Sequence, residues 1–327
     1  MPVGHVAYFA LGGTISMTGS QGTDVVARLS GEDLLRDLAQ LPAEVRVHSP
    51  YAVPSASLTF ADVLDVVDRA AKAVADGAVG IVLTQGTDTL EETAFLVDSV
   101  WTHEAPFVLT GAMRNPSLPG ADGPANLVAA LQVAAAQEAQ GRGALVVFAD
   151  EIHAARHVRK AHSTSTATFV SADLGPIGHV IEGTPRFLAR VPARTPVTGW
   201  TRDSLDRTRI ALHTTTLDDD GADLVHLSGH RHGLVLSGFG VGHVPERVVP
   251  LLVPLIDEMP VVLTSRTGGG AVLADTYGAP GSERDLRARG VIGGGFVHPY
   301  KARVLLRLLV AAGADRAQIA AAFAALG

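Results

Sequence analysis

The chain of 327 residues contains no cysteine. Disulfide bonds and thiolate metal sites are therefore excluded, and the cytoplasm is the expected compartment. No apolar run approaches the length of a membrane span, and the N-terminus does not resemble a secretory signal, so we expect neither a membrane partner nor a leader. Basic residues are not in excess either: the net charge of −7 argues against a nucleic-acid partner.

Lysine is scarce. Only Lys72, Lys160 and Lys301 occur in a chain whose other basic residues are arginines. One explanation is compositional bias, since Ala, Gly and Val are also abundant. A lysine, unlike an arginine, can lose its proton within reach of working pH. Lys160 is the one to examine, because it lies in a polar segment, residues 150–171, directly after a buried strand.

The chain is 47% hydrophobic, which is enough for a large core divided between two domains. Strand-like and helix-like segments alternate, which predicts an α/β fold: a larger N-terminal domain with a mostly parallel sheet covered by helices, and a smaller C-terminal α/β domain. A stretch rich in Pro and Arg without periodicity predicts the linker. We place the domains at residues 1–185 and 208–327, with the linker at 186–207.

One stretch, Val79 to Phe95 (VGIVLTQGTDTLEETAF), organises the larger domain. Its first five residues predict a buried parallel strand. A polar turn follows, and Thr89 with Glu92 has the spacing of a capping box at the start of a helix. Thr87 and Asp88 therefore lie at the carboxyl end of a strand, where open α/β sheets bind ligands. The alternative is that Asp88 or Thr89 only caps the helix.

An earlier segment repeats this arrangement. His5 to Leu11 predicts a strand, Gly12 and Gly13 a sharp turn, and Thr14 then presents a hydroxyl at the strand's carboxyl end. Neither a G-x-G-x-x-G nor a Walker pattern follows, so a nucleotide site is disfavoured. The small, polar residues from Ser16 to Val26 have the composition of a lid loop.

Two groups of histidines suggest metal sites, but no carboxylate or fourth ligand stands at a recognised spacing from them. We therefore expect no metal and interpret these side chains as solvated surface histidines: His153, His157, His162, His226, His230 and His232.

Threonines, an aspartate and a lysine at strand ends point to covalent acyl chemistry. A threonine hydroxyl is a poor nucleophile until a neighbouring base takes its proton. A lysine oriented by an aspartate can act as that base, in the way that His and Asp serve a catalytic serine. Such a lysine has to be neutral at least transiently, and therefore partly buried.

Five ordered motifs make the chain similar to the bacterial-type L-asparaginases, a family of two-domain amidohydrolases. The resemblance runs nearly from end to end, and its motifs are FALGGTIS, LTQGTDTLEETAF, TGAMRNPSLPGADGPANL, VRKAHSTSTATFVS and HPYKARVLL.

The resemblance implies a role for each matched residue. Thr14 becomes the acylated nucleophile, and Thr87, Asp88 and Lys160 a second triad, in which Asp88 also holds the substrate's α-ammonium. Ser55 matches the serine that binds the α-carboxylate. The resemblance implies neither a metal nor an organic cofactor. It does imply a homo-oligomer, a dimer or a tetramer, whose sites form between subunits.

The sequence departs from the family in the part that recognises a free amino acid. No tyrosine occurs between Tyr8 and Tyr51, where the family has one after the first threonine. Ala56 replaces the glutamine that follows the substrate-binding serine. His243 ends the turn Gly240–His243, where the family has an asparagine. The neighbouring subunit's acidic residue has no clear counterpart, and Tyr277 lies in that region.

We therefore predict an amidohydrolase that converts L-asparagine to L-aspartate and ammonia through a threonine nucleophile. The substrate-binding set is Ser55, Ala56, Asp88, His243 and Tyr277. One alternative keeps this chemistry but uses a modified asparagine, another β-amide or a small peptide. A second is an amino-acid-binding homologue without turnover. A tRNA-dependent amidotransferase subunit also resembles the family, but would require an additional N-terminal domain.

Overall fold

A computed structural model of the chain describes residues 4–18, 26–27, 29–36, 38, 41–192 and 195–326. The chain forms two compact units: unit 1 is Met1–Pro196 and unit 2 is Val197–Gly327. The boundary falls inside the range 186–207, where the sequence predicts a linker. Most of the expected lid loop, residues 19–25, lies outside the described residues.

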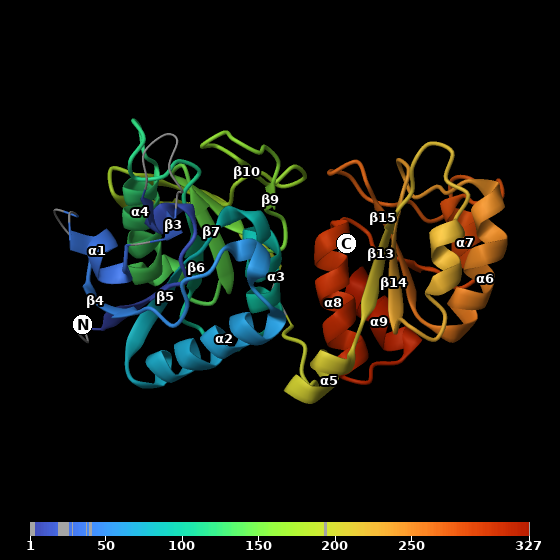
Figure 1. Cartoon of the computed structure of the whole chain (residues 1–327), viewed down its shortest axis with the longest axis horizontal. Coiled ribbons are helices and arrows are strands. Elements are labelled where there is room, and N and C mark those ends of the chain that lie inside the picture. The colour runs from blue at the N-terminus through green and yellow to red at the C-terminus, as the bar shows by residue number, and fades with distance from the viewer. Residues whose placement is uncertain are drawn as a thin grey trace. The chain divides into compact units, whose positions relative to one another are not determined.

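Unit 1 is built on an eight-stranded sheet in the order β12-β11-β8-β7-β6-β5-β1-β4 (Figure 1). Its strands are β1 (His5–Ala10), β4 (Glu44–His48), β5 (Ala78–Thr84), β6 (Phe107–Thr110), β7 (Ala144–Phe148), β8 (Glu151–Ala154), β11 (Gly178–Ile181) and β12 (Thr184–Phe187). Its helices are α1 (Gly31–Arg36), α2 (Phe60–Ala75), α3 (Leu90–Val100) and α4 (Gly123–Ala135). Two short ribbons complete it: β2 (Met17–Thr18) with β3 (Val26–Ala27), and β9 (Arg159–Lys160) with β10 (Phe169–Val170).

The central strands run parallel from β4 through β1, β5 and β6 to β7, and the last three strands are antiparallel. Alternating strands and helices produce this order because a crossover helix returns the chain to the same edge of the sheet. Helix α4 packs on one face, where Leu127 and Leu131 join a buried cluster with Val82 and Val108. Helix α2 contacts β5, and helix α3 contacts β7. The predicted mostly parallel sheet with covering helices is confirmed.

The helix starts show where local signals decide the structure and where they do not. The predicted capping box at Thr89 and Glu92 is wrong: the Thr89 side chain does not cap α3 and instead donates to the Ser55 carbonyl at 3.0 Å. A complete box, in which Thr59 and Asp62 bond reciprocally, instead caps α2. A threonine hydroxyl makes whichever bond the packing brings within reach, so spacing alone did not identify the cap.

The sequence analysis missed the antiparallel end of this sheet. It interpreted residues 150–171 as a polar segment and residues 186–207 as the linker. The structure contains β8 in the first, and β12, which pairs with β11, ends inside the second. Pro185 is compatible with β12 because that strand lies at the edge of the sheet, where a missing N–H breaks no ladder.

Unit 2 is a smaller α/β domain with a four-stranded parallel sheet in the order β13-β14-β15-β16 (Figure 1). Its strands are β13 (Ile210–Thr214), β14 (Gly233–Gly238), β15 (Val261–Ser265) and β16 (Ile292–Gly293). Its helices are α5 (Arg202–Arg207), α6 (Val249–Glu258), α7 (Glu283–Ala288), α8 (Pro299–Ala311) and α9 (Arg316–Ala324). Among the described residues of both units, no helix has the length and apolarity needed to cross a membrane.

Three turns meet at the carboxyl edge of the parallel strands in unit 1, and glycines let them approach. A Cβ atom on Gly13, after β1, would lie 2.2 Å from the backbone nitrogen of Gly86, after β5. A Cβ on Gly111, after β6, would lie 2.6 Å from the carbonyl oxygen of Gln85. Real Cβ atoms do not approach backbone atoms so closely, so these turns pack against one another through backbone alone.

We predict that Gly13→Ala lowers the free energy of unfolding by more than about 4 kcal/mol, because it combines a left-handed backbone with a backbone clash. Gly77→Ala is the matched control: its φ of 97° resembles the 87° of Gly13, but no atom lies within 4 Å of its Cβ position. The control should lose only about 1–2 kcal/mol. Urea denaturation of both variants measures the difference, and equal losses would contradict the packing argument.

Candidate active site

The two threonines of the repeated strand–turn pattern lie on neighbouring turns. Thr14 begins a short 3₁₀ helix after β1 (η1, Thr14–Ser16), and Thr87 begins another after β5 (η3, Thr87–Thr89). Each directly follows a glycine of the close contact between Gly13 and Gly86. Thr87 is buried and Thr14 is partly exposed. The packing of the turns therefore presents two threonines side by side at one edge of the sheet.

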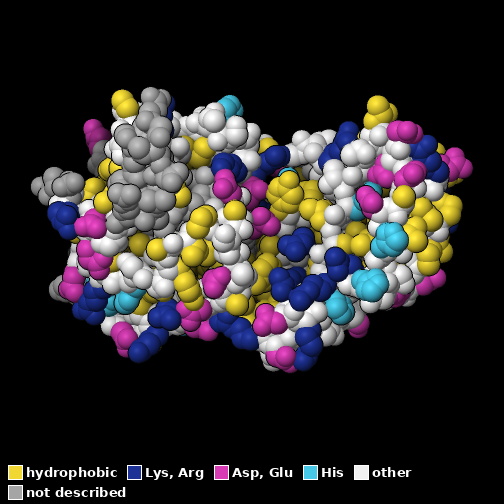
Figure 2. Space-filling view, in the orientation of Figure 1, with side chains coloured by type: hydrophobic (Ala, Val, Ile, Leu, Met, Phe, Trp, Pro, Cys, Tyr) yellow, Lys and Arg dark blue, Asp and Glu magenta, His cyan; other side chains and the backbone are white. Residues whose placement is uncertain are grey.

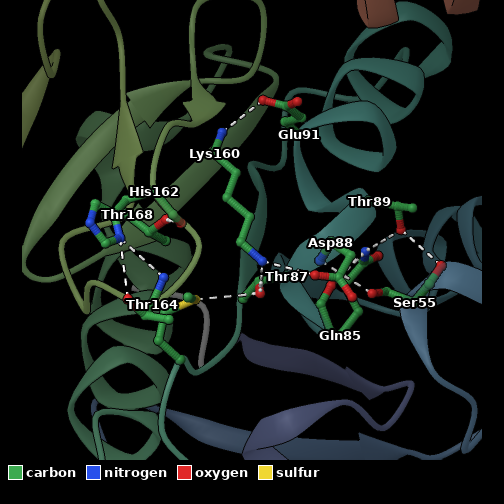
Figure 3. Close-up of polar contacts among 12 residues, drawn as sticks. Ser55, Gln85, Thr87, Asp88, Thr89, Glu91, Lys160, His162, Thr164 and Thr168 are labelled. Carbon is green, nitrogen blue, oxygen red and sulfur yellow. Dashed lines mark hydrogen bonds and ion pairs between the residues drawn. The ribbon is translucent and has the colours of Figure 1, made fainter.

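Lys160 lies with its ammonium between Thr87 and Asp88 (Figure 3). Its Nζ donates to Thr87 Oγ1 at 2.8 Å and to Asp88 Oδ1 at 2.9 Å. The Lys160 side chain is 17% exposed, while the Asp88 side chain is 70% exposed. The structure thus brings together three of the residues that the sequence singled out, in a chain of contacts from carboxylate to ammonium to hydroxyl.

Lys160 reaches this place from a segment outside the parallel strands. Strand β9 pairs with β10, and the Lys160 backbone N–H donates to the Glu91 carboxylate at 2.7 Å. Glu91 is buried in the first turn of α3, immediately after the turn that carries Thr87. Figure 3 shows the lysine extending from this anchor toward Thr87. Glu91 therefore holds the backbone from which the ammonium projects.

Ser55 contacts the turn that carries Asp88. Its side chain is buried, and its Oγ accepts a hydrogen bond from the Asp88 backbone N–H at 3.3 Å. A Cβ on Gly86 would lie 2.6 Å from the same oxygen. Ala56, the next residue of this short 3₁₀ helix (η2, Ser55–Ser57), is exposed. Ser55 therefore contacts the turn that carries Asp88, and Ala56, where the sequence departs from the family, is open to solvent beside it.

A third turn supplies a partner for Thr87 that the sequence analysis did not find. The Thr87 hydroxyl donates to Met113 Sδ at 3.5 Å. Asp122 holds this turn by accepting from the backbone N–H groups of Met113 and Arg114. In this arrangement the Thr87 proton points to sulfur and its oxygen accepts from Lys160. The lysine is therefore the donor here and has to lose a proton before it can act as a base.

Neither tyrosine that flanks the first threonine's loop is available to replace the missing family tyrosine. Tyr8 is buried in β1, and its Oη lies 2.9 Å from Thr84 Oγ1 in a hydrogen bond. Burial raises the pKa of the Tyr8 phenol far above its ordinary value. Tyr51 donates to the Asp65 carboxylate at 2.8 Å. Both hydroxyls stabilise the fold within unit 1.

The remaining predicted binding residues, His243 and Tyr277, lie together in unit 2. Their rings meet edge to face, with centroids 5.0 Å apart. His243 Nε2 lies 3.0 Å from the carboxylate of Glu283, whose side chain is fully buried. Glu283 also accepts from the backbone N–H groups of Thr276 and Tyr277. This carboxylate, which the sequence analysis missed, fixes both the histidine and the segment that carries the tyrosine.

The state of Glu283 decides what His243 can do. Burial alone would raise the pKa of the Glu283 carboxyl, but hydrogen bonds from the Tyr277 backbone and from His243 outweigh burial, so the pKa is lowered. The carboxylate is then an acceptor, and His243 Nε2 carries a proton toward it. A neutral His243 ring thus offers only an acceptor at Nδ1, whereas a protonated ring offers a second donor.

The histidines that the sequence interpreted as solvated differ in their burial. His153 corrects that interpretation: it is 1% exposed and lies within hydrogen-bonding distance of Ser171 and Glu151. It is buried because β8, which the sequence analysis missed, carries it into the sheet. His157 is half-buried, and His162, His226, His230 and His232 are exposed. Figure 2 shows histidine side chains at the surface of the molecule. Within the residues that the structure describes, His, Cys, Asp and Glu side chains form no group of three or more arranged to hold a metal ion.

The sequence contains only a weak signal for the residues that were missed. Glu91 stands between Leu90 and Glu92 within the quoted motif, and a carboxylate that is buried requires a partner. Met113 lies in a loop motif without a feature that predicts its contact to Thr87. Glu283 starts α7, which the sequence analysis also missed.

Both units of the chain are similar in sequence to known proteins. Residues 5–192 match the family described as "Asparaginase, N-terminal", and residues 209–323 match "Glutaminase/Asparaginase C-terminal domain". The chain is 34% identical to a "Probable L-asparaginase" of Deinococcus radiodurans over 287 residues, covering 86% of this chain and 85% of the relative. It is 32% identical to "L-asparaginase 2" of Escherichia coli, covering 96% of this chain and 91% of that protein.

A solved structure is similar along nearly the whole chain. It is the crystal structure of a "Probable Cytoplasmic L-asparaginase" from Campylobacter jejuni, which superposes with a TM-score of 0.86 at 28% identity. The similarity covers 98% of this chain and 99% of that one, so both units have counterparts in one protein.

Proposed function

The chain belongs to the asparaginase family, and from this premise we propose that it hydrolyses the side-chain amide of L-asparagine to give L-aspartate and ammonia. One observation carries the mechanism: Lys160 Nζ lies 2.8 Å from Thr87 Oγ1 and 2.9 Å from Asp88 Oδ1, beside the turn that carries Thr14. A hydroxyl, an ammonium and a carboxylate in contact are the groups that activate a nucleophile.

The reaction proceeds in two steps. The Thr14 hydroxyl oxygen attacks the amide carbon, the C–N bond breaks, and ammonia leaves with the proton that the hydroxyl gave up. This leaves the β-acyl group esterified to Thr14. A water molecule then attacks the ester, restores the threonine hydroxyl and releases aspartate. The overall exchange is one amide and one water for one carboxylic acid and one ammonia, and it requires no co-reactant.

Thr87, Lys160 and Asp88 move the protons for these steps. Lys160 in its neutral form takes a proton from the Thr87 hydroxyl, which then accepts one from the attacking group. Asp88 keeps the lysine in place through the 2.9 Å contact. Because the Asp88 carboxylate is largely exposed, it also has a face for the substrate's α-ammonium. Ser55 lies beneath it as the partner of the α-carboxylate.

By the same inference the protein acts in the cytoplasm on a small amide. It does so as a homo-oligomer, in which unit 2 of one subunit completes the site of another. What supports this is the similarity to a protein described as a cytoplasmic L-asparaginase and the grouping of His243, Tyr277 and Glu283 in unit 2. No organic cofactor takes part in the proposed chemistry.

One observation favours a related reaction, the hydrolysis of a modified asparagine or another β-amide. Ala56 is exposed next to Ser55, where the family's glutamine side chain would add a hydrogen bond to the amino-acid head group. The space beside Ala56 is open to a bulkier substrate or to water. The head group of free asparagine is then held mainly by Asp88 and Ser55.

The first prediction tests turnover and the nucleophile. Purified protein should release ammonia from asparagine, and Thr14→Ala and Thr87→Ala should each reduce kcat by at least about 10³-fold, since both hydroxyls take part in bond making. Neither variant should unfold: Thr14→Ala should lower the free energy of unfolding by less than about 1 kcal/mol, and Thr87→Ala, which removes a buried partner of Lys160, by about 1–3 kcal/mol. The double variant should be scarcely worse than either single one. Near wild-type turnover in Thr14→Ala, or no turnover in the wild type, would overturn the covalent mechanism.

The second prediction concerns Lys160 as a proton acceptor. Arginine keeps its charge at any working pH and cannot accept a proton. The kcat of Lys160→Arg should therefore be nearly as low as that of Lys160→Met, within about tenfold. Wild-type kcat should rise with pH, because only the neutral lysine can accept a proton. A pH series of kcat for the three proteins makes the measurement. Recovery of most activity by arginine, or a flat profile, would leave Lys160 as an electrostatic anchor only.

The third prediction concerns affinity. Each missing hydrogen bond to a charged head group weakens binding roughly ten- to a hundredfold, so KM for asparagine should be on the order of millimolar. Glutamine should be poorer, because its additional methylene misplaces the amide relative to Thr14. Ala56→Gln should lower KM by about tenfold with little change in kcat, because it restores one hydrogen bond.

The control for this prediction is Ser57→Gln, which adds the same side chain at an exposed position on the same turn and should leave KM unchanged. Assays with asparagine derivatives altered at the α-amine or the α-carboxylate separate the two substrate classes. A micromolar KM for free asparagine, with no turnover of the derivatives, would refute the reduced head-group binding.

A further inference from the structure

A pocket of about 440 Å³ lies in unit 1 and is lined by three arginines, Arg142, Arg156 and Arg190, together with Asp98 and Glu138. It also includes Ala144 at the amino end of β7 and Ala154 at the end of β8. The threonines of the candidate active site follow the carboxyl ends of β1 and β5. Because β7 runs parallel to these strands through β6 and β5, the pocket lies at the opposite edge of the sheet.

Arg142 is held rigidly at this pocket. Its Nε donates to the Glu138 carbonyl at 2.6 Å, and its Nη1 donates to the Ala189 carbonyl at 3.0 Å. The guanidinium also stacks over the Phe187 ring, 4.0 Å from the centroid. These contacts fix the orientation of the group with neutral partners. Its positive charge is thus positioned without a carboxylate among the contacts that hold it.

Arg190 adds a second positive charge next to the first. Arg190 lines the same pocket as Arg142. Burial and, after it, the Arg190 guanidinium lower the pKa of Arg142. Arg190 is exposed and so supplies its charge from the solvent side. Two like charges that line one pocket favour its occupation by an anion.

Arg156 adds a third positive charge from a buried position. Its side chain is 7% exposed and faces Asp98 at 3.7 Å, which is longer than a hydrogen bond. The Asp98 carboxylate is also an acceptor for the Ala144 backbone N–H at 3.1 Å. Glu138 is exposed, so water screens its charge. The buried carboxylate is therefore shared, and the guanidiniums exceed the carboxylates that line the pocket.

We propose that this pocket binds a small oxyanion ligand, one that carries a carboxylate or phosphate group, between the guanidiniums of Arg142, Arg156 and Arg190. Planar guanidinium groups pair with such oxygens through two parallel N–H donors, and a pocket of this volume admits a small molecule. The ligand would relieve the repulsion between Arg142 and Arg190 and give Arg156 an anionic partner besides Asp98.

One segment of the chain connects the pocket to Lys160. Arg156 and Lys160 belong to one short segment, which follows the side of α3 from Asp98 in its last turns to Glu91 in its first. The pocket is nevertheless separate from the residues of the proposed reaction, so binding can be measured independently of turnover.

The experiment is calorimetric titration of the full-length protein with inorganic phosphate and, separately, with succinate. Binding of either probe that Arg190→Gln weakens supports the site, and the probe that binds more tightly there identifies the ligand as phosphate-like or carboxylate-like. Arg190→Gln should weaken that binding by at least about tenfold, the loss expected for one charge-assisted hydrogen bond. Because Arg190 is exposed, the variant should fold normally, which its thermal unfolding will verify.

Arg186→Gln is the matched control. It removes the same charge from strand β12, on which Arg186 points to the face opposite Phe187 and thus away from Arg142. Its affinity for the probe should equal that of the wild type. The proposal is overturned if neither probe binds at about 10 mM, if Arg190→Gln binds like the wild type, or if Arg186→Gln loses as much affinity as Arg190→Gln.

Discussion

The candidate active site depends on the absence of side chains where three turns meet. Gly13, Gly86 and Gly111 follow three parallel strands, and a Cβ atom on any of them would lie 2.6 Å or less from an atom of a neighbouring turn or of Ser55. Since the turns touch through backbone, the residues next to these glycines have fixed positions relative to one another. Thr14 and Thr87 thereby gain a common location that neither strand could supply alone. The sheet brings the turns to one edge, and the glycines bring them into contact.

Lys160 is positioned by a different principle, a chain of polar contacts with buried anchors. Glu91 holds its backbone, and Thr87 and Asp88 hold its ammonium. The lysine spans from β9 to the turn after β5, so its reach depends on both ends of the side chain. The low exposure of the lysine, 17%, keeps solvent from competing for these contacts. Asp88 is exposed by contrast, which suits a carboxylate that orients the lysine on one side and meets a ligand on the other.

Sequence reasoning predicted the parallel sheet and most of its elements because buried strands and amphipathic helices leave periodic patterns. It placed Thr87 and Asp88 at a strand's carboxyl end; the scarcity of lysine singled out Lys160, and the resemblance gave it a role. It did not predict β8, β11 and β12, because these strands mix polar and apolar residues and β12 contains Pro185. Nor did it predict Glu91, Met113 or Glu283, because a contact between residues distant in sequence leaves no local pattern. The capping box at Thr89 failed for the same reason: a bond to Ser55 replaced the local one.

The two halves of the proposed site place opposite demands on protonation. Lys160 has to lose a proton before it can accept one from Thr87, which favours alkaline conditions. His243 directs Nε2 toward the Glu283 carboxylate, so it can donate to a substrate carboxylate through Nδ1 only while the ring holds a second proton. The family's asparagine would donate without gaining a proton, whereas this histidine has to gain one. The proposed chemistry thus requires a lysine that has lost a proton, and the proposed head-group binding requires a histidine that has gained one. A substrate without an α-carboxylate is free of the histidine's requirement, and for it only the lysine's demand remains.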